Sequence, residues 1–166
     1  MKFKPRYDLP PVTGRLLYVA RDYAINFMPI SSAELRRRRG EFGEFTVGVD
    51  TLQLVAGLET RQLVSAWGYF PRPGWKAAKL GPPPARGGAV MVELSWEPEN
   101  ADYEIPGTRA WKRFFDASTG WVMAGDGLDQ RAQYIEFLQG AVLAIRDEEL
   151  VGIWLHPEFV EALPNG

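Results

Sequence analysis

The chain contains 1 histidine, His156, so any serine–histidine–acid arrangement would have to use it. A nucleophilic serine of the hydrolase kind lies in a G-x-S-x-G turn. Ser118, in the segment DASTG, comes nearest to that pattern but lacks the first glycine. His156 stands before Pro157 at the end of a predicted strand, where a ring nitrogen can bond to a turn carbonyl. We therefore expect a structural role for His156 and no catalytic triad.

Carboxylates are the other candidates for chemistry. Four acids stand close together in segment 97–104, EPENADYE, and hard cations bind such oxygens. The spacing fits no calcium loop, and a chain with 0 cysteines and 1 histidine offers few ligands to a transition metal. We expect a solvated acidic loop here, with no metal site and no cofactor. Two acids from distant segments that share a cleft, as glycosidases use, stay open as an alternative.

Phosphate and nucleic-acid motifs are weak. Segment 40–45, GEFGEF, has glycines three apart but lacks the lysine and the helix of a phosphate loop. Four arginines follow one another at 36–39. Consecutive helical positions spread over about 300° around the axis, so these arginines form no single stripe. The net charge of -2 also disfavours a nucleic-acid surface, and we do not expect nucleic acid as a partner.

Aromatic residues mark the best candidate for a binding surface. Trp67 and Tyr69 share one face of a predicted strand, which leads into the proline-rich segment 71–88 with Arg72 and Trp75. Trp, Tyr and Arg are enriched at binding hot spots. Large aromatics also fill the cores of β-proteins, and that alternative stays open. We expect the contact surface at these four side chains, with alanine at Arg72 or Trp75 leaving the fold intact.

Short strands must position these residues. Hairpins are predicted where two β-prone runs flank a polar turn: 15–19 with 23–28, 52–58 with 62–70, 110–115 with 121–125, and 141–145 with 150–155. Further strands are predicted at 45–49, 89–96 and, with a helix as the alternative, 133–138. The total of about nine to eleven short strands predicts a mainly β fold with minor helices, as an antiparallel sheet, sandwich or partly open barrel.

Two short helices are predicted. Ser31 followed by Glu34 is a capping-box pattern, and Gly40 would end that helix. Segment 157–163 has proline at its first position, which is typical of a helix start.

The chain has the composition of one globular domain, with 46% apolar and 24% charged residues among 166. We expect a single domain over 1–166, without an internal repeat. Residues 1–14, which contain three prolines, are expected to form an extended N-terminal arm. Segment 71–88, PRPGWKAAKLGPPPARGG, is about 18 residues long and exceeds the usual loop length; such loops tend to be functional or disordered.

The absence of cysteine excludes disulfides and thiolate chemistry and favours a reducing compartment, so we expect a cytoplasmic protein. The longest apolar run, 141–145, is far below the roughly 20 residues that cross a bilayer, so no membrane partner is expected.

No motif in the sequence identifies a function. The leading hypothesis is a non-catalytic interaction or accessory protein that binds another protein through a surface near 67–79, with its oligomeric state open. One alternative is a small-molecule-binding β-barrel with an interior pocket. The other is a carboxylate-based hydrolase, which requires two close, buried acids in one cleft.

Overall fold

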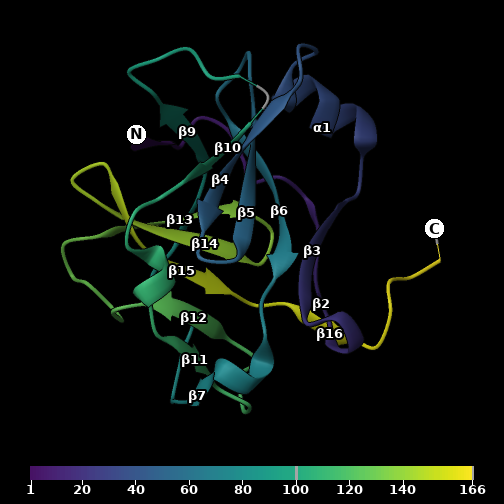
Figure 1. Ribbon diagram of the computed structural model, residues 1–166, viewed down its shortest axis with the longest axis vertical. Coiled ribbons are helices and arrows are strands. Elements are labelled where there is room, and N and C mark those ends of the chain that lie inside the picture. Colours follow the sequence, from purple (N-terminus) through teal and green to yellow (C-terminus); the bar gives the residue numbers. More distant parts are fainter. Residues whose placement is uncertain (100, 166) are drawn as a thin grey trace.

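The computed structural model describes residues 1–99 and 101–165, and strands dominate them (Figure 1). The strands form two seven-stranded sheets and one two-stranded sheet, broadly a β-sandwich. The predicted mainly β fold is therefore confirmed. The described residues contain one α-helix, α1 (Ser32–Arg39). They also contain 16 strands, more than expected, because several edge strands span only two or three residues and show no alternating pattern in the sequence.

The first large sheet, here the Trp67 sheet, carries the aromatic strand of the sequence prediction. Its strand order is β10 (Asp102–Glu104), β4 (Glu44–Val49), β5 (Leu52–Gly57), β6 (Leu63–Tyr69), β3 (Ala24–Pro29), β2 (Gly14–Val19) and β16 (Glu158–Val160). The five inner strands pair antiparallel, and the two outermost strands, β10 and β16, pair parallel with their neighbours.

The second large sheet, here the Trp154 sheet, repeats this order. It runs β8 (Arg86–Gly87), β13 (Gln133–Leu138), β14 (Ala141–Arg146), β15 (Glu149–Leu155), β12 (Val122–Gly125), β11 (Arg113–Phe115) and β7 (Lys76–Ala77). Again the five inner strands are antiparallel and the two outermost strands pair parallel. When the two sheets are compared in the orders given, each strand of one sheet has a counterpart in the other that runs in the same relative direction.

The register of the central strands supports this equivalence. The β5–β6 ladder shifts register after Val55, and the β14–β15 ladder shifts at the matching place, after Ala144. When the two ladders are aligned at these shifts, the pair Gln53–Trp67 matches the pair Val142–Trp154. Trp67 of β6 and Trp154 of β15 are therefore equivalent positions. The two strands share Leu, Val and Trp in LVSAW (63–67) and LVGIW (150–154). The expectation of no internal repeat is thus wrong for the topology, because too few side chains match for the sequence to reveal it.

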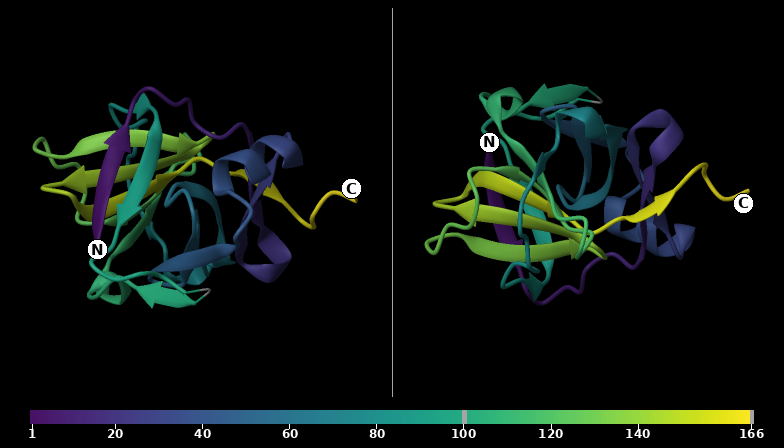
Figure 2. Two further views of the ribbon diagram at one scale, coloured as in Figure 1. Left: turned by 90° about the horizontal axis from the view of Figure 1, so that it is seen from above. Right: turned by 90° about the horizontal axis from the view of Figure 1, so that it is seen from below.

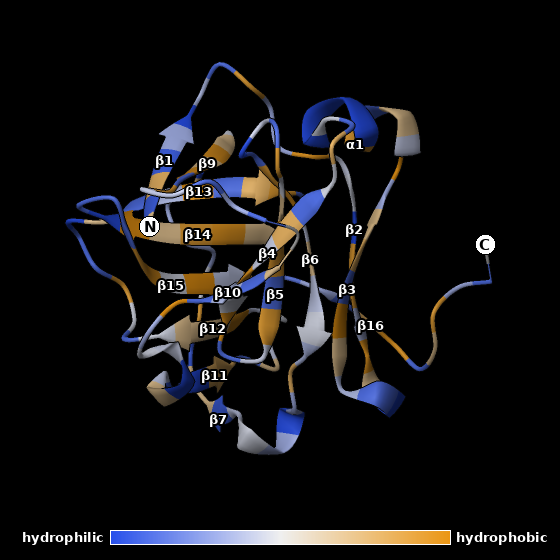
Figure 3. Cartoon of the chain, turned by 45° about the horizontal axis from the view of Figure 1, so that its top comes forward, coloured by the Kyte–Doolittle hydropathy of each residue, from blue (hydrophilic) through white to orange (hydrophobic). Residues whose placement is uncertain are grey.

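The third sheet changes the picture of the N-terminal arm. β1 (Lys2–Arg6) pairs antiparallel with β9 (Ala89–Glu93), and Phe3 is buried. The first part of the arm is therefore a strand that contributes to the core. That main core takes buried side chains from all three sheets, and Figure 3 shows the apolar residues concentrated on the strands while α1 is mostly polar.

The four predicted hairpins and the strand at 133–138 are confirmed. The first predicted helix is also confirmed: the Ser31 hydroxyl accepts the Glu34 N–H at 3.1 Å, and Gly40 ends α1. The helix predicted at 157–163 is wrong. This segment forms β16, because parallel pairing with β2 brings Phe159 against Tyr18, with ring centroids 5.4 Å apart.

No helix in the described part of the chain is both long and apolar enough to cross a membrane.

Candidate functional site

Two aromatic side chains stand on the outer face of β6. Trp67 is 50% exposed and Tyr69 is 53% exposed, whereas Phe70 points the other way and is 1% exposed. The prediction that Trp67 and Tyr69 share one face of their strand is therefore confirmed. A groove of about 400 Å³ runs beside the two rings, and we call it the Trp67 groove; its lining residues are Val19, Asp22, Ala24, Ile25, Asn26, Trp67, Gly68, Tyr69 and Leu163. Its volume lies within the range of ordinary ligand sites.

The turn between β2 and β3 forms one side of this groove. Tyr23 packs edge-on against Tyr69, with ring centroids 6.4 Å apart. The Phe70 N–H donates to the Tyr23 carbonyl at 2.6 Å, which ties this turn to the end of β6. Asp22, from the same turn, brings a carboxylate to the groove, and Arg21 lies 3.5 Å from it. The groove therefore combines aromatic walls with one acidic group.

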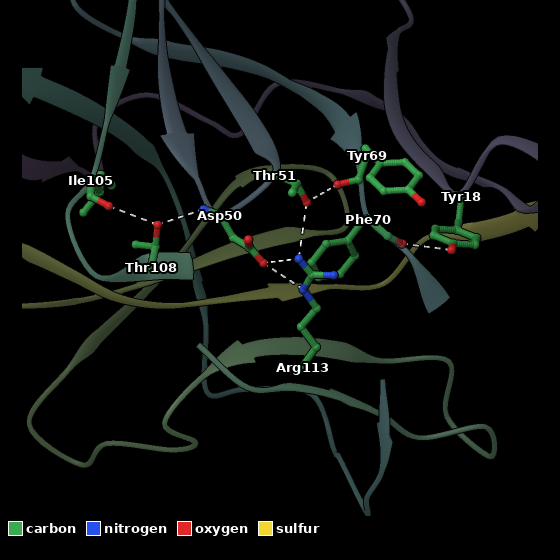
Figure 4. A network of polar contacts seen from close by, with 8 residues as sticks. All are labelled: Tyr18, Asp50, Thr51, Tyr69, Phe70, Ile105, Thr108 and Arg113. Carbon is green, nitrogen blue, oxygen red and sulfur yellow. Dashed lines mark hydrogen bonds and ion pairs between the residues drawn. The ribbon is translucent and has the colours of Figure 1, made fainter. Parts of the chain in front are cut away.

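A polar network holds the backbone at the end of β6 in place (Figure 4). The Thr51 hydroxyl donates to the Tyr69 carbonyl. The Tyr18 hydroxyl donates to the Phe70 carbonyl at 2.9 Å and accepts the Arg72 N–H at 3.1 Å. Burial raises the pKa of the Tyr18 phenol above its ordinary value, so the hydroxyl stays protonated and keeps its role as donor.

An ion pair anchors this network to the other large sheet. Arg113 of β11 donates to the carboxylate of Asp50, in the turn between β4 and β5, and their side chains are only 13% and 9% exposed. The Arg113 guanidinium also lies over the Phe70 ring, 4.6 Å from its centroid. The Asp50 N–H donates to the Thr108 hydroxyl at 2.8 Å. The strand that carries Trp67 and Tyr69 is therefore supported on a rigid base.

The structure separates the four side chains that the sequence grouped together. Trp67 and Tyr69 line the groove, whereas Trp75 is half-buried and packs on Tyr18 and Phe115, with centroid distances of 4.9 Å and 5.2 Å. Arg72 is exposed and its guanidinium lies 5.2 Å from the Phe115 ring. Trp75 therefore packs against the core, and we now expect its removal to reduce stability, unlike that of Arg72.

The proline-rich segment is an ordered covering of the Trp154 sheet. Within it, residues 78–85, here the strap, place Leu80 in a buried cluster with Met123, Trp154 and other outer-face side chains. The Leu80 N–H donates to the Asp116 carboxylate at 2.8 Å, and the Thr119 hydroxyl donates to the Leu80 carbonyl at 2.9 Å. Trp154 is 2% exposed beneath this cover.

Asp116 is the acid that holds the strap. Its carboxylate accepts the Ser118 hydroxyl at 2.6 Å, the Leu80 N–H and the Ser118 N–H. The Ser118 hydroxyl bond first, then these backbone donors, lower the pKa of Asp116 to about 2. All these contacts serve structure, so the DASTG segment is a turn that secures the strap.

A cavity of about 570 Å³ lies beside the strap, and His156 is one of its lining residues. His156 stacks on Trp121 with centroids 4.8 Å apart, and its Nε2 bonds to the Thr119 carbonyl at 2.9 Å. The predicted bond to a turn carbonyl is therefore confirmed. Glu158 pairs with Arg15 at 2.8 Å, and Glu136 accepts the Gly140 N–H at 3.0 Å. Each ionisable group here is already engaged in a structural contact.

No cluster of three potential metal-ligating side chains exists among residues 1–99 and 101–165. Two acids of the 97–104 segment form ion pairs: Glu97 with Arg61 at 2.8 Å, and Glu104 with Arg109 at 2.6 Å.

No model of a known protein family matches the chain, and no curated protein matches it in sequence. Geometry therefore has to carry the functional conclusion. Sequence reasoning missed Asp22, Asn26 and Leu163 as parts of the groove. Two of them, Asp22 and Asn26, lie on the β2–β3 hairpin, which was predicted, but its place next to β6 depends on strand order and has no local signal in the sequence.

Proposed function

We propose that this protein is a non-catalytic interaction protein that binds another protein through the Trp67 groove. The observation that carries the proposal is a pair of half-exposed aromatic side chains, Trp67 and Tyr69, beside an open groove of about 400 Å³. Tyr and Trp dominate binding hot spots because they bury a large area and lose few rotamers. Tyr23 and Leu163, also partly exposed, extend the same apolar surface.

The rigid base beneath the groove supports a binding role. Association costs free energy when loops and side chains must be ordered, so a preorganised surface binds more tightly than a mobile one. Here Thr51 and Tyr18 bond to the backbone at the end of β6, and the Asp50–Arg113 pair holds the turn between β4 and β5 that carries Thr51.

The partner is proposed to be a protein rather than nucleic acid. Two of the four arginines of α1 are engaged: Arg38 contacts Glu34 at 3.0 Å, and Arg39 contacts Glu44 at 3.4 Å. Arg36 and Arg37 alone are a small basic surface, whereas nucleic-acid sites need several phosphate contacts. The cysteine-free composition supports a cytoplasmic location as part of the same proposal.

One specific observation favours a second candidate, the binding of a small molecule. The 570 Å³ cavity has Trp121, stacked on His156, in its wall, and its volume lies within the range of small-molecule sites. This site lies outside the core and not inside a barrel, since the two large sheets keep separate edge strands. The hydrolase alternative has less support: the most buried acids, Asp50 and Asp116, are held by Arg113 and by strap contacts respectively.

A capture experiment tests the proposed function. The wild-type protein, the double variant Trp67→Ala/Tyr69→Ala and the matched variant Trp96→Ala would serve as baits for proteins of the native cell. Trp96 is a suitable control because it is 45% exposed and does not line the groove. We expect a protein retained by the wild type and by Trp96→Ala but lost from the double variant. After purification, this partner should bind the double variant at least tenfold more weakly, as loss of a hot spot implies. Equal retention of the same proteins by all three baits would contradict the proposal.

A further inference from the structure

The two large sheets present equivalent outer faces, and among residues 1–99 and 101–165 a strap covers only one of them. Trp154 lies opposite Met123 and Val142 on its neighbouring strands, and Trp67 lies opposite the equivalent residues, Asn26 and Gln53. The edge strands β7 and β16 are also equivalent, with Lys76 and Glu158 at matching ladder positions, and a leucine follows each strand closely, Leu80 four residues after Lys76 and Leu163 five residues after Glu158. The covered face therefore gives a structural template for a segment that could lie on the open face.

On the covered face, the strap binds as an extended peptide would. Leu80 is 8% exposed and packs in the cluster that contains Trp154. In the turn between β11 and β12, the Asp116 carboxylate accepts the Leu80 N–H and the Thr119 hydroxyl donates to the Leu80 carbonyl. Three prolines follow Leu80 after one glycine, and Pro83 is buried.

On the open face, the corresponding groups lack such an occupant. Asp22 belongs to the turn between β2 and β3, the counterpart of the turn that carries Asp116, and its carboxylate lines the Trp67 groove. Leu163 is 45% exposed, far more than Leu80. The segment after β16 runs away from the sheets instead of across them (Figures 1 and 2).

We infer that the Trp67 groove binds an extended segment of a partner protein with the chemistry of the strap, a basic residue and a leucine followed closely by prolines. This inference rests on the proposed function and names its partner. The leucine packs on Trp67 as Leu80 packs with Trp154, and its N–H donates to Asp22. The amide of Asn26, which lines the groove where the covered face has Met123, can bond to the peptide backbone.

The charge and composition of the groove fit this occupant. Asp22 is the charged residue among the described residues that line it, and its pair with Arg21 is exposed, so a basic residue next to the leucine, like Lys79 beside Leu80, adds a further favourable charge contact. Prolines hold a peptide in an extended form before it binds, which lowers the entropy lost on binding. Aromatic walls such as Trp67 and Tyr69 are the surfaces on which such segments dock.

The test uses an acetylated peptide with the sequence of residues 76–85, KAAKLGPPPA, titrated into the full chain by calorimetry. We expect saturable binding with a Kd of about 10 μM to 1 mM, the range of weak peptide recognition. Trp67→Ala should weaken it at least tenfold, Asp22→Asn several-fold, and the control Trp96→Ala not at all. A peptide with aspartate in place of leucine should bind at least tenfold more weakly. Circular dichroism would verify that each variant is folded.

Two results would overturn the inference. One is the absence of saturable binding by the wild type up to about 1 mM peptide, the weakest affinity the proposal allows. The other is unchanged binding by Trp67→Ala, which would mean that the peptide occupies another site, such as the face of its own strap. If the peptide fails while capture of a protein still depends on Trp67 and Tyr69, the proposed function stands and the peptide chemistry is wrong. If capture is independent of both residues, the proposed function itself fails.

Discussion

Trp67 and Trp154 occupy the same position in two sheets of the same strand order, yet Trp67 is 50% exposed and Trp154 is 2% exposed. The strap accounts for the difference, because it lays Leu80 over the outer face of the Trp154 sheet. The residues beside each tryptophan also differ in polarity. Met123 and Val142, beside Trp154, are apolar, whereas Asn26 and Gln53, beside Trp67, are polar. One face is therefore packed under the strap, and the other is open in the part of the chain that the structure describes.

The largest expected effect is on stability, and it distinguishes the removal of Trp154 from the removal of Trp67. Trp154→Ala should reduce the free energy of unfolding by about 3–5 kcal/mol, the usual result for a buried tryptophan, because it empties the space beneath the strap. Trp67→Ala should cost less than about 1 kcal/mol, since half of its ring is already in water. Urea denaturation measures both. Equal losses would mean that the two faces do not differ in role.

The Asp50–Arg113 pair tests how the two large sheets are held together. It joins the turn between β4 and β5 of the Trp67 sheet to β11 of the Trp154 sheet. Asp50→Ala leaves a nearly buried guanidinium without its partner, so we expect a loss of about 3 kcal/mol. The double variant Asp50→Asn/Arg113→Met removes both charges, keeps a residue type that tolerates the φ of 57° at position 50, and should recover most of that loss. Failure of the double variant to recover stability would show that the network, and not the ion pair, sets the geometry.

Variants of Trp75 and Arg72 test whether Trp75 packs against the core while Arg72 lies at the surface. Trp75→Ala should cost about 2 kcal/mol, less than a fully buried tryptophan because its ring is only half-buried. Arg72→Ala should change the free energy of unfolding by less than about 0.5 kcal/mol, since its side chain is exposed. Thermal denaturation of the two variants compares them directly. Identical melting temperatures for both would place Trp75 outside the core.

The smallest expected effect concerns the grip of Asp116 on the strap, and it depends on pH. Its pKa is lowered to about 2 in the folded protein, so the unfolded chain binds more protons between this value and the ordinary value of 3.8. The stabilisation is therefore complete above about pH 4 and is lost as the pH falls toward 2. Asp116→Asn should be less stable than the wild type at neutral pH, and the gap should close in acid. A gap in urea midpoint that is constant from pH 6 to 2 would contradict this role.

Much of the fold could be predicted from local patterns. The hairpin between 141–145 and 150–155 has a polar tip between two β-prone runs, and the cap at Ser31 needs only its neighbour Glu34. The segment 157–163 was predicted wrongly because a proline start is equally compatible with an edge strand. Only the distant pairing with β2, and the contact of Phe159 with Tyr18, decide between them.

The candidate site could be predicted in part. Alternation in β6 placed Trp67 and Tyr69 on one face, because period two is a local property of a strand. It could not separate Trp75 from them, since that ring is held by residues from β2 and β11, about 60 and 40 positions away in the chain. The strap and the equivalence of the two sheets were invisible for the same reason, because strand order is set by long-range packing.

The most direct test of the account follows the 6 tryptophan indole N–H signals by NMR while the peptide KAAKLGPPPA is added. The account predicts that the Trp67 signal shifts progressively and saturates, with the Trp154 signal unchanged beneath its strap. A shift of the Trp154 signal with Trp67 unchanged would contradict it, because the peptide would then be displacing the strap and the open face would have no affinity for such a segment.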